Sequence, residues 1–290
     1  MTAAPASVSI IGPGRVGTAL ATALPLEQYA VRFVAGRGPE SLARFRAAVP
    51  GVEVRTPEDA ARDADVVLLC VPDDVLAPLV RGLAVADAVR PGSAWLHTAG
   101  GHGLAPLRPA MLAGARVAAC HPAQTFPDPE AGAAALPGTA WAVTADGADL
   151  AWAQRFVHAL GGTAVVVADA NRALYHAALV LGANGTSSVV AQAREVLLGA
   201  GVADPAALLT PLVTAAARNA AARGAAALTG PVRRGDAGTV AANLAALRAD
   251  VPETAAAYVA LARLALRQAV RAGLPPELAD AVGTILSEED

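Results

Sequence analysis

The sequence predicts an α/β protein, with a Rossmann-type doubly wound, mainly parallel sheet followed by an all-α domain. Short β-rich runs alternate with helical stretches up to about residue 168. A glycine-rich turn directly follows the first of these runs. After residue 169 the strand pattern stops and only helical patterns continue. We therefore predict a dinucleotide-binding domain over residues 1–169 and an all-helical domain over residues 170–290.

The predicted strands are short and are separated by loops rich in Gly, Pro and Asp, as βα loops usually are. The segment 65–71 (DVVLLCV) has a continuously apolar middle, which is typical of a strand buried on both faces. Residues 52–55 form a shorter run that is only a possible strand. The strands are expected at 7–11, 29–35, 52–55, 65–71, 94–98, 115–119, 139–144 and 163–168.

The helical part begins with one long predicted helix, which Gly199, Gly201 and Pro205 end. A polar loop at 228–236 separates two later helices, and Pro252 stands in the first turn of another. The helices are expected at 171–199, 205–223, 237–249, 253–272 and 275–287.

Composition excludes several classes of protein. The formal charge of −3 gives no electrostatic basis for binding nucleic acid, and no apolar run is long enough to span a membrane. Two cysteines, Cys70 and Cys120, fit a reducing compartment. The first residues lack the charged region of a signal peptide, so we expect a cytoplasmic protein that acts on a small molecule.

The chain contains no lysine, and all 22 of its basic residues are arginine. Schiff-base chemistry, a P-loop lysine and a lysine general acid are therefore excluded. The sequence also predicts no metal site.

A GxGxxG motif follows the first predicted strand and opens a helix. In this context the glycines permit a tight turn, close approach of a pyrophosphate and close helix packing. A glycine turn without ligand and the nucleoside site of a methyltransferase are the alternatives. The expected cofactor contacts are Gly12, Pro13, Gly14, Arg15, Val16 and Gly17.

The end of the second strand indicates which dinucleotide binds. NAD-binding proteins usually place an acidic residue here for the ribose hydroxyls, whereas this chain has Arg37. An arginine can pair with the 2′-phosphate. The sequence therefore predicts NADP(H), and a solvated surface arginine is the alternative.

The ends of two later strands should border the same cofactor, because ligands of open α/β sheets bind at the carboxyl edge. Val71, Pro72 and Thr98 are the expected contacts there. Asp73 and Asp74 are interpreted as caps of the following helix.

Two of the five histidines are candidate proton donors. His121 ends a predicted strand on the crevice side, with a structural turn as the alternative. His176 lies near the start of the long helix. In a regular helix Ser187 would project within about 20° of His176, and Asn184 about 80° away. Asn184 is expected to orient the substrate, while a buried structural role is the alternative for His176.

The polar loop at 228–236 contains candidate substrate ligands. Thr229 offers a hydroxyl, and Arg234 or its neighbour Arg233 could bind a carboxylate. Asp236 is expected to cap the next helix. A loop that is merely held together by arginine–aspartate pairs is the alternative.

The chain resembles a bacterial family of Rossmann-like oxidoreductases, whose helical domain is related to those of 6-phosphogluconate dehydrogenase and pyrroline-5-carboxylate reductase. This chain has Ala99 and Ala119 where serine is usual in the family, and Arg172 where lysine is usual. The motifs that carry the resemblance are GPGRVG at 12–17, HTAG at 97–100, HPAQTF at 121–126, YHAA at 175–178 with Asn184, and ALTGPVRRGD at 227–236.

The resemblance implies NADP binding, a homodimer built on the helical domain and a reductase activity. Ketopantoate reductases are similar, but they rely on a lysine that this chain lacks, so His176 would have to replace it or the substrate would differ. We expect reduction of a small ketone or imine that bears a carboxylate. The alternatives are a non-catalytic NADP-binding sensor or assembly protein, and a deazaflavin-dependent NADP oxidoreductase.

Overall fold

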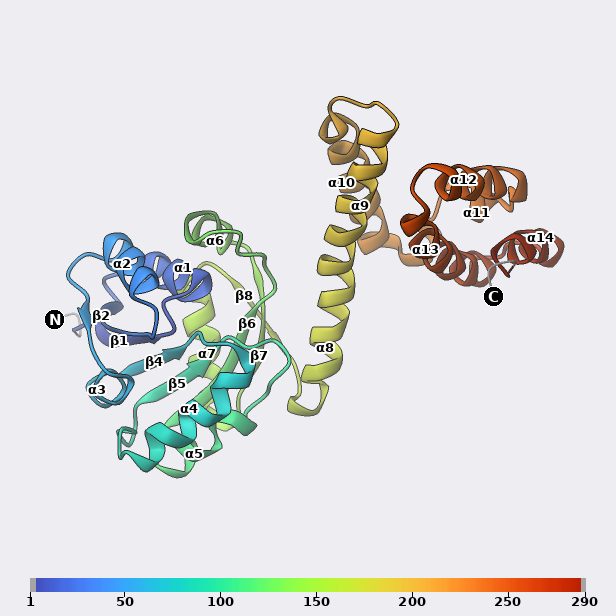
Figure 1. Ribbon diagram of the computed structural model, residues 1–290. Helices are drawn as coiled ribbons and strands as arrows, with labels where there is room; N and C mark the ends of the chain where they lie inside the picture. The colour runs from blue at the N-terminus through green and yellow to red at the C-terminus, as the bar shows by residue number, and fades with distance from the viewer. Residues whose placement is uncertain (1–3, 288–290) are drawn as a thin grey trace. The chain divides into compact units, whose positions relative to one another are not determined.

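The computed structural model describes residues 4–287, and the chain divides into two compact units. The first unit ends at Leu181 and the second begins at Gly182. The first is an eight-stranded sheet with helices on both faces, and the second is helical (Figure 1). The predicted fold class is therefore confirmed.

The sheet of the first unit has the strand order β3-β2-β1-β4-β5-β6-β7-β8. All neighbouring strands are parallel except β6 and β7, which pair antiparallel. This order reverses direction between β1 and β4, where ligands of such sheets bind. The strands are β1 Ala6–Ile11, β2 Tyr29–Ala35, β3 Glu53–Val54, β4 Val66–Leu69, β5 Ala94–His97, β6 Arg116–Pro122, β7 Ala140–Thr144 and β8 Thr163–Val166.

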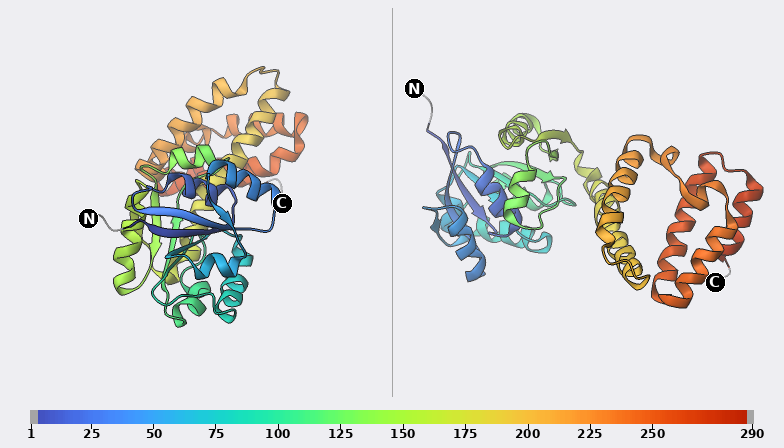
Figure 2. Two further views of the ribbon diagram at one scale, coloured as in Figure 1. Left: turned by 90° about the vertical axis from the view of Figure 1, so that its left-hand side faces the viewer. Right: turned by 90° about the horizontal axis from the view of Figure 1, so that it is seen from above.

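Helices cover both faces of this sheet, as the views in Figure 2 also show. Successive residues of a strand point to opposite faces, so Val66 and Leu68 join one core while Val67 and Leu69 join the other. The first core contacts α1 Arg15–Ala23, α2 Pro39–Ala48 and α7 Gly147–Ala159, and the second contacts α3 Pro57–Arg62, α4 Asp73–Val85 and α5 Arg108–Leu112. The remaining helices are α6 Pro129–Ala135 and α8 Arg172–Leu179.

Among the described residues of the second unit, the last four helices build one apolar core. Val240 and Leu244 of α12 pack with Val259 of α13 and Val282 of α14. These helices are α11 Gly230–Arg234, α12 Ala237–Asp250, α13 Pro252–Arg271 and α14 Pro276–Ser287.

The two preceding helices, α9 Gly185–Gly199 and α10 Pro205–Arg223, pack against each other. Neither contributes to an apolar core of the described residues: α9 buries no side chain, and α10 buries only Pro205. Leu208 and Leu212 of α10 are largely exposed. This helix pair is thus the least covered apolar part of the second unit.

Two predictions about the helical segments after residue 169 are wrong. The expected regular helix over 171–199 is interrupted by a π-helical turn at Val180–Asn184, which shifts the face on which Asn184 and Ser187 project. The hydroxyl of Thr186, in the first turn of α9, donates to the Gly182 carbonyl of this π-helical turn. The predicted loop at 228–236 contains the short helix α11. No helix within residues 4–287 is long and apolar enough to cross a membrane.

Candidate dinucleotide and proton-transfer site

The glycine motif forms a tight turn between β1 and α1, and each glycine has a distinct physical reason. Gly12 has a φ of 105°, and a side chain on it would clash with the carbonyl group of Cys70. A side chain on Gly17 would clash with the Gly12 carbonyl. A side chain on Gly14 would meet nothing within 4 Å, so the turn is open there. The turn is thus tightly packed at Gly12 and Gly17 and open at Gly14, where an anion could approach the N-terminus of α1.

The other predicted cofactor residues surround this turn. Pro13 is buried, and it lies so close to Gly36 that a side chain on Gly36 would clash with its ring. This contact holds the glycine turn against the end of β2. Arg37, the next residue, is exposed and makes no ion pair with any of the residues described. Arg15 is also exposed, at the start of α1, and Val16 is half-buried.

The ends of β4 and β5 lie at the same edge of the sheet. Val71 and Pro72 follow β4, and Thr98 follows β5. Asp73 and Asp74 occupy the first turn of α4, where they complement its dipole. The prediction that they cap this helix is wrong, because the cap residue is Pro72 and no side chain bonds there.

The loop that follows β5 is held by one face of α8 and the turn before it. The carboxylate of Asp169 accepts a hydrogen bond of 2.6 Å from the backbone N–H of Leu104. The Arg172 guanidinium, 1% exposed, donates to the carbonyls of Ala99, His102 and Ala142 at 2.7–3.1 Å. Arg172 therefore ties α8 both to this loop and to β7.

Within this framework the two candidate proton donors lie together. The His121 and His176 rings are 5.6 Å apart between centroids and nearly perpendicular. Nδ1 of His121 is 3.0 Å from the Tyr175 hydroxyl. Both imidazoles pack on Gly100, where a side chain would clash with His176 and would lie 3.0 Å from Nε2 of His121. The absence of a side chain at Gly100 is thus what lets the two rings meet.

Burial and positive charge keep His121 neutral. Desolvation, followed by the charges of Arg172, His176 and His97, lowers the pKa of His121 to about 4. The pKa of His97 is likewise lowered to about 4, mainly by burial. His97 bonds through Nε2 to the Gly103 carbonyl at 2.8 Å, so it serves the loop as a structural side chain. Burial raises the pKa of the Tyr175 hydroxyl, and the charge of Arg172 opposes that rise.

The remaining predicted site residues belong to the second unit. Asn184 is exposed in the π-helical turn. Thr229 is exposed directly before α11, and the Arg234 guanidinium, 64% exposed, lies 3.8 Å from the Asp236 carboxylate. Asp236 caps α12 by accepting from the backbone N–H of Thr239 at 3.0 Å, which confirms its predicted role.

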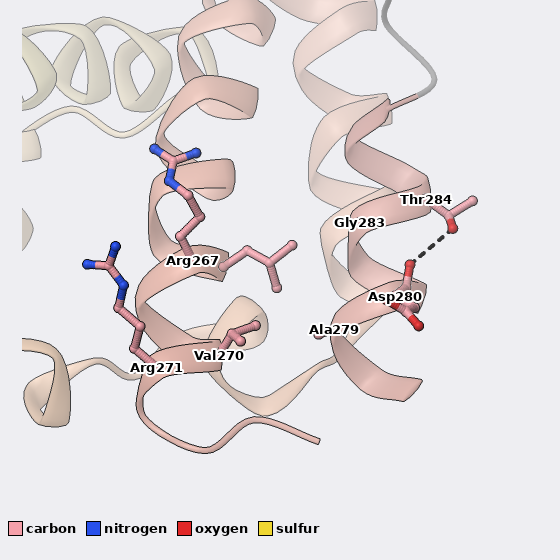
Figure 3. A pocket seen from close by; sticks show the side chains of 8 residues that line it. Arg267, Val270, Arg271, Ala279, Asp280, Gly283 and Thr284 are labelled. Carbon is pink, nitrogen blue, oxygen red and sulfur yellow. Dashed lines mark hydrogen bonds between the residues drawn. The ribbon is translucent and has the colours of Figure 1, made fainter. Parts of the chain in front are cut away.

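A separate hollow lies between α13 and α14 in the second unit (Figure 3). Val270 is one of the apolar side chains that line it. Figure 3 shows the guanidinium groups of Arg267 and Arg271 pointing away from Asp280, so its charged groups do not converge on one point. Within residues 4–287, no group of three or more His, Cys, Asp or Glu side chains could hold a metal ion.

The family motifs contain Gly100 and Tyr175, and Arg172 stands out as a departure from the family, but the sequence assigned none of the three to this cluster. The spacing of Asp169, Arg172 and His176 would place them on one helical face, and that was the available signal. Nothing in the sequence distinguishes a buried arginine from the many exposed ones, because the partners of Arg172 are backbone carbonyls of distant segments.

Family models match two parts of the chain. Residues 1–122 match a Rossmann-like domain, and residues 139–265 match a domain of unknown function, DUF2520. No protein of curated function matches this sequence.

Several crystal structures have a similar fold. A protein from Bacteroides fragilis, described as an NADP oxidoreductase whose activity is unproven, is 23% identical with a TM-score of 0.74, over 90% of this chain and 98% of that chain. A Thermotoga maritima protein is 18% identical with a TM-score of 0.66, over 91% and 98%. An imine reductase from Myxococcus stipitatus in complex with NADP+ is 20% identical with a TM-score of 0.66, over 92% and 95%. At these identities the likeness shows the fold.

Proposed function

We propose that this protein is an NADP(H)-dependent reductase of a small ketone or imine that bears a carboxylate. The observation that carries the proposal is the glycine turn, which is open at Gly14 and closed at Gly12 and Gly17, at the carboxyl edge of a parallel sheet. The similarity in fold to an imine reductase in complex with NADP+ supports the same reading.

The residues present fit a dinucleotide. The pyrophosphate would lie over Gly14 and the first turn of α1, flanked by Pro13, Arg15 and Val16. Arg37 is exposed and unpaired with any described residue, so its guanidinium is available for a 2′-phosphate. Val71, Pro72 and Thr98 would border the rest of the cofactor at the sheet edge.

The nicotinamide, when bound, supplies the hydride that adds to the carbon of a C=O or C=N bond. The protein must then provide one proton to the oxygen or nitrogen, and His176 and His121 are the candidate donors. We assign the orientation of the substrate oxygen or nitrogen to the Asn184 amide.

The carboxylate of the substrate is assigned to the loop before α12. Arg234 is mostly exposed and only 3.8 Å from Asp236, so a substrate carboxylate could compete for its donors. Thr229 would add a hydroxyl. Aromatic residues make up 3% of the chain, which favours a compact aliphatic substrate over a bulky aromatic one.

We also propose a homodimer built through the helical unit. Helices α9 and α10 leave Leu208 and Leu212 exposed and bury almost none of their own side chains. Exposed apolar surface of this kind is stabilised when a second copy covers it.

The first experiment is a titration of the purified protein with NADPH and NADH, for the wild type and for Arg37→Ala. We expect the wild type to prefer NADPH. Loss of a charge-assisted contact weakens NADPH binding by roughly 10- to 100-fold, while NADH binding stays the same. Arg32→Ala is the matched control, because Arg32 is also an exposed arginine and lies on β2, just before the turn that carries Arg37.

The results divide the alternatives. If neither nucleotide binds, the reductase proposal fails. Tight NADPH binding with no reduction of any keto acid or cyclic imine would favour a non-catalytic sensor. Turnover only with added deazaflavin would favour a deazaflavin-dependent NADP oxidoreductase.

A further inference from the structure

One buried polar atom in the histidine cluster has no partner. Nδ1 of His176 is inaccessible to solvent and makes no hydrogen bond to any residue described. A buried, unpaired ring nitrogen is costly and calls for an explanation. Nε2 of His121 lies near it, because a side chain on Gly100 would be within 3.0 Å of both nitrogens.

The hydrogen bonds around His121 decide which atoms can carry protons. The Tyr175 hydroxyl at 3.0 Å can donate to Nδ1 of His121. In that arrangement neutral His121 carries its proton on Nε2, the ring nitrogen that lies near Gly100 together with the unpaired Nδ1 of His176. Nδ1 of His176 would accept that proton's hydrogen bond, which leaves the His176 proton on Nε2.

We propose that Tyr175, His121 and His176 form a proton relay in which His176 is the donor to the substrate and the other two are positioning residues. The inference rests on the proposed reductase function for its substrate. Catalytic hydrogen bonds are often long before substrate binds, and the relay requires the one between the two imidazoles to form in the free protein in solution.

The relay is balanced in protons and charge. Nε2 of His176 gives its proton to the oxygen or nitrogen of the substrate, and Nδ1 of His176 takes the Nε2 proton of His121. Nδ1 of His121 then takes the Tyr175 hydroxyl proton. The negative charge ends on the Tyr175 oxygen, and solvent returns the proton afterwards.

The groups around the relay favour this neutral route. Burial disfavours a positive charge on His121 most, and the neighbouring Arg172, His176 and His97 disfavour it further. The Arg172 guanidinium lies 5.6 Å from the Tyr175 ring centroid and stabilises negative charge on that hydroxyl. Burial raises the pKa of the Tyr175 hydroxyl, and Arg172 limits that rise. Arg172 thus opposes an imidazolium on His121 and lowers the cost of a phenolate on Tyr175.

The test that is independent of activity is nitrogen-15 NMR of the histidine side chains in the full-length protein. We expect both His121 and His176 to be fixed as the tautomer protonated on Nε2. Tyr175→Phe removes the donor to His121, and we expect both rings then to become tautomer mixtures. A wild-type His176 protonated on Nδ1, or a His121 ring that Tyr175→Phe does not affect, would overturn the relay.

Two glycines supply a matched pair of variants in the same loop. Gly100→Ala places a methyl group against His176 and should abolish the fixed tautomer. Gly101→Ala meets His176 only at 3.6 Å or more and should preserve it. Neither glycine has a positive φ, so alanine does not strain the backbone at either position, and the two variants differ in their contact with His176. Equal spectra for the two variants would contradict the proposed contact.

Turnover adds a second readout. In Tyr175→Phe the chain of proton transfers cannot end on a phenolate, so we expect kcat to fall at least 10-fold and its pH profile to differ from that of the wild type. A wild-type pH profile in this variant would overturn the relay. The NADPH titration tests the reductase proposal separately, and the tautomers decide the relay whether or not NADPH binds.

Discussion

The two units of this protein differ in how completely they bury their own apolar residues. In the first unit both faces of the sheet are covered, and strand residues such as Leu68 and Leu69 are fully buried on opposite sides. In the second unit α11–α14 form a core, whereas α9 and α10 contribute nothing to it within the described residues.

The histidines and tryptophans are also unevenly divided between the two units. All five histidines and all three tryptophans lie before residue 182, so they belong to the first unit. The first unit thus holds a self-contained, pH-sensitive cluster, while the second presents exposed leucines and arginines. A unit that is complete in itself can position proton-transfer groups rigidly, and one that is incomplete is suited to association.

The largest expected difference is in pH dependence. His97 and His121 have pKa values of about 4 in the folded protein, against about 6.5 when unfolded. Between these values the unfolded state binds more protons, so the stability of the first unit is lost as the pH falls from 6.5 to 4. The upper limit is about 3 kcal/mol for each histidine.

Tryptophan fluorescence during urea unfolding reports on the first unit alone, because the second contains no tryptophan. His121→Gln should reduce the pH dependence, and His158→Gln, on the exposed surface of α7, should not. A midpoint that does not move between pH 6.5 and 4 would show that the two buried histidines titrate normally.

Core and exposed leucines of the second unit should respond differently to truncation. Leu244→Ala leaves a cavity in the core and should lower the free energy of unfolding by about 2–5 kcal/mol. Leu212→Ala, at a side chain 67% exposed, should change it by less than about 0.5 kcal/mol but weaken self-association. Circular dichroism and sedimentation measure the two effects. Unchanged sedimentation of Leu212→Ala would argue against a dimer through α10.

The last comparison is between a buried and an exposed arginine, and its measure is the loss in the free energy of unfolding. Arg172→Met removes the donor to three backbone carbonyls, two of them in buried hydrogen bonds, with some relief from removing a buried charge, so we expect a loss of about 2–4 kcal/mol. Arg194→Met on α9 breaks an exposed pair with Glu195 and should cost less than about 0.5 kcal/mol. Urea unfolding followed by circular dichroism measures both losses. Similar unfolding midpoints for the two variants would show that Arg172 does not hold the loop to α8.

Much of the architecture could be predicted from local sequence. Alternating β and α segments, the apolar run at 65–71 and the GxGxxG turn predict a parallel sheet, because each depends on residues close together in the chain. The π-helical turn at 180–184 could not be predicted in this way. A helical pattern continues through it, and its few small residues do not by themselves indicate a change in hydrogen-bond register.

By itself, the sequence determined the fold class, the open glycine turn and the presence of His121 and His176 as candidates. Only the tertiary structure decided that these histidines meet over Gly100, that Tyr175 bonds to one of them and that Arg172 is buried beside them. The physical reason is that protonation and tautomers depend on burial and on partners more than 50 residues apart in sequence. Local patterns do not contain such contacts.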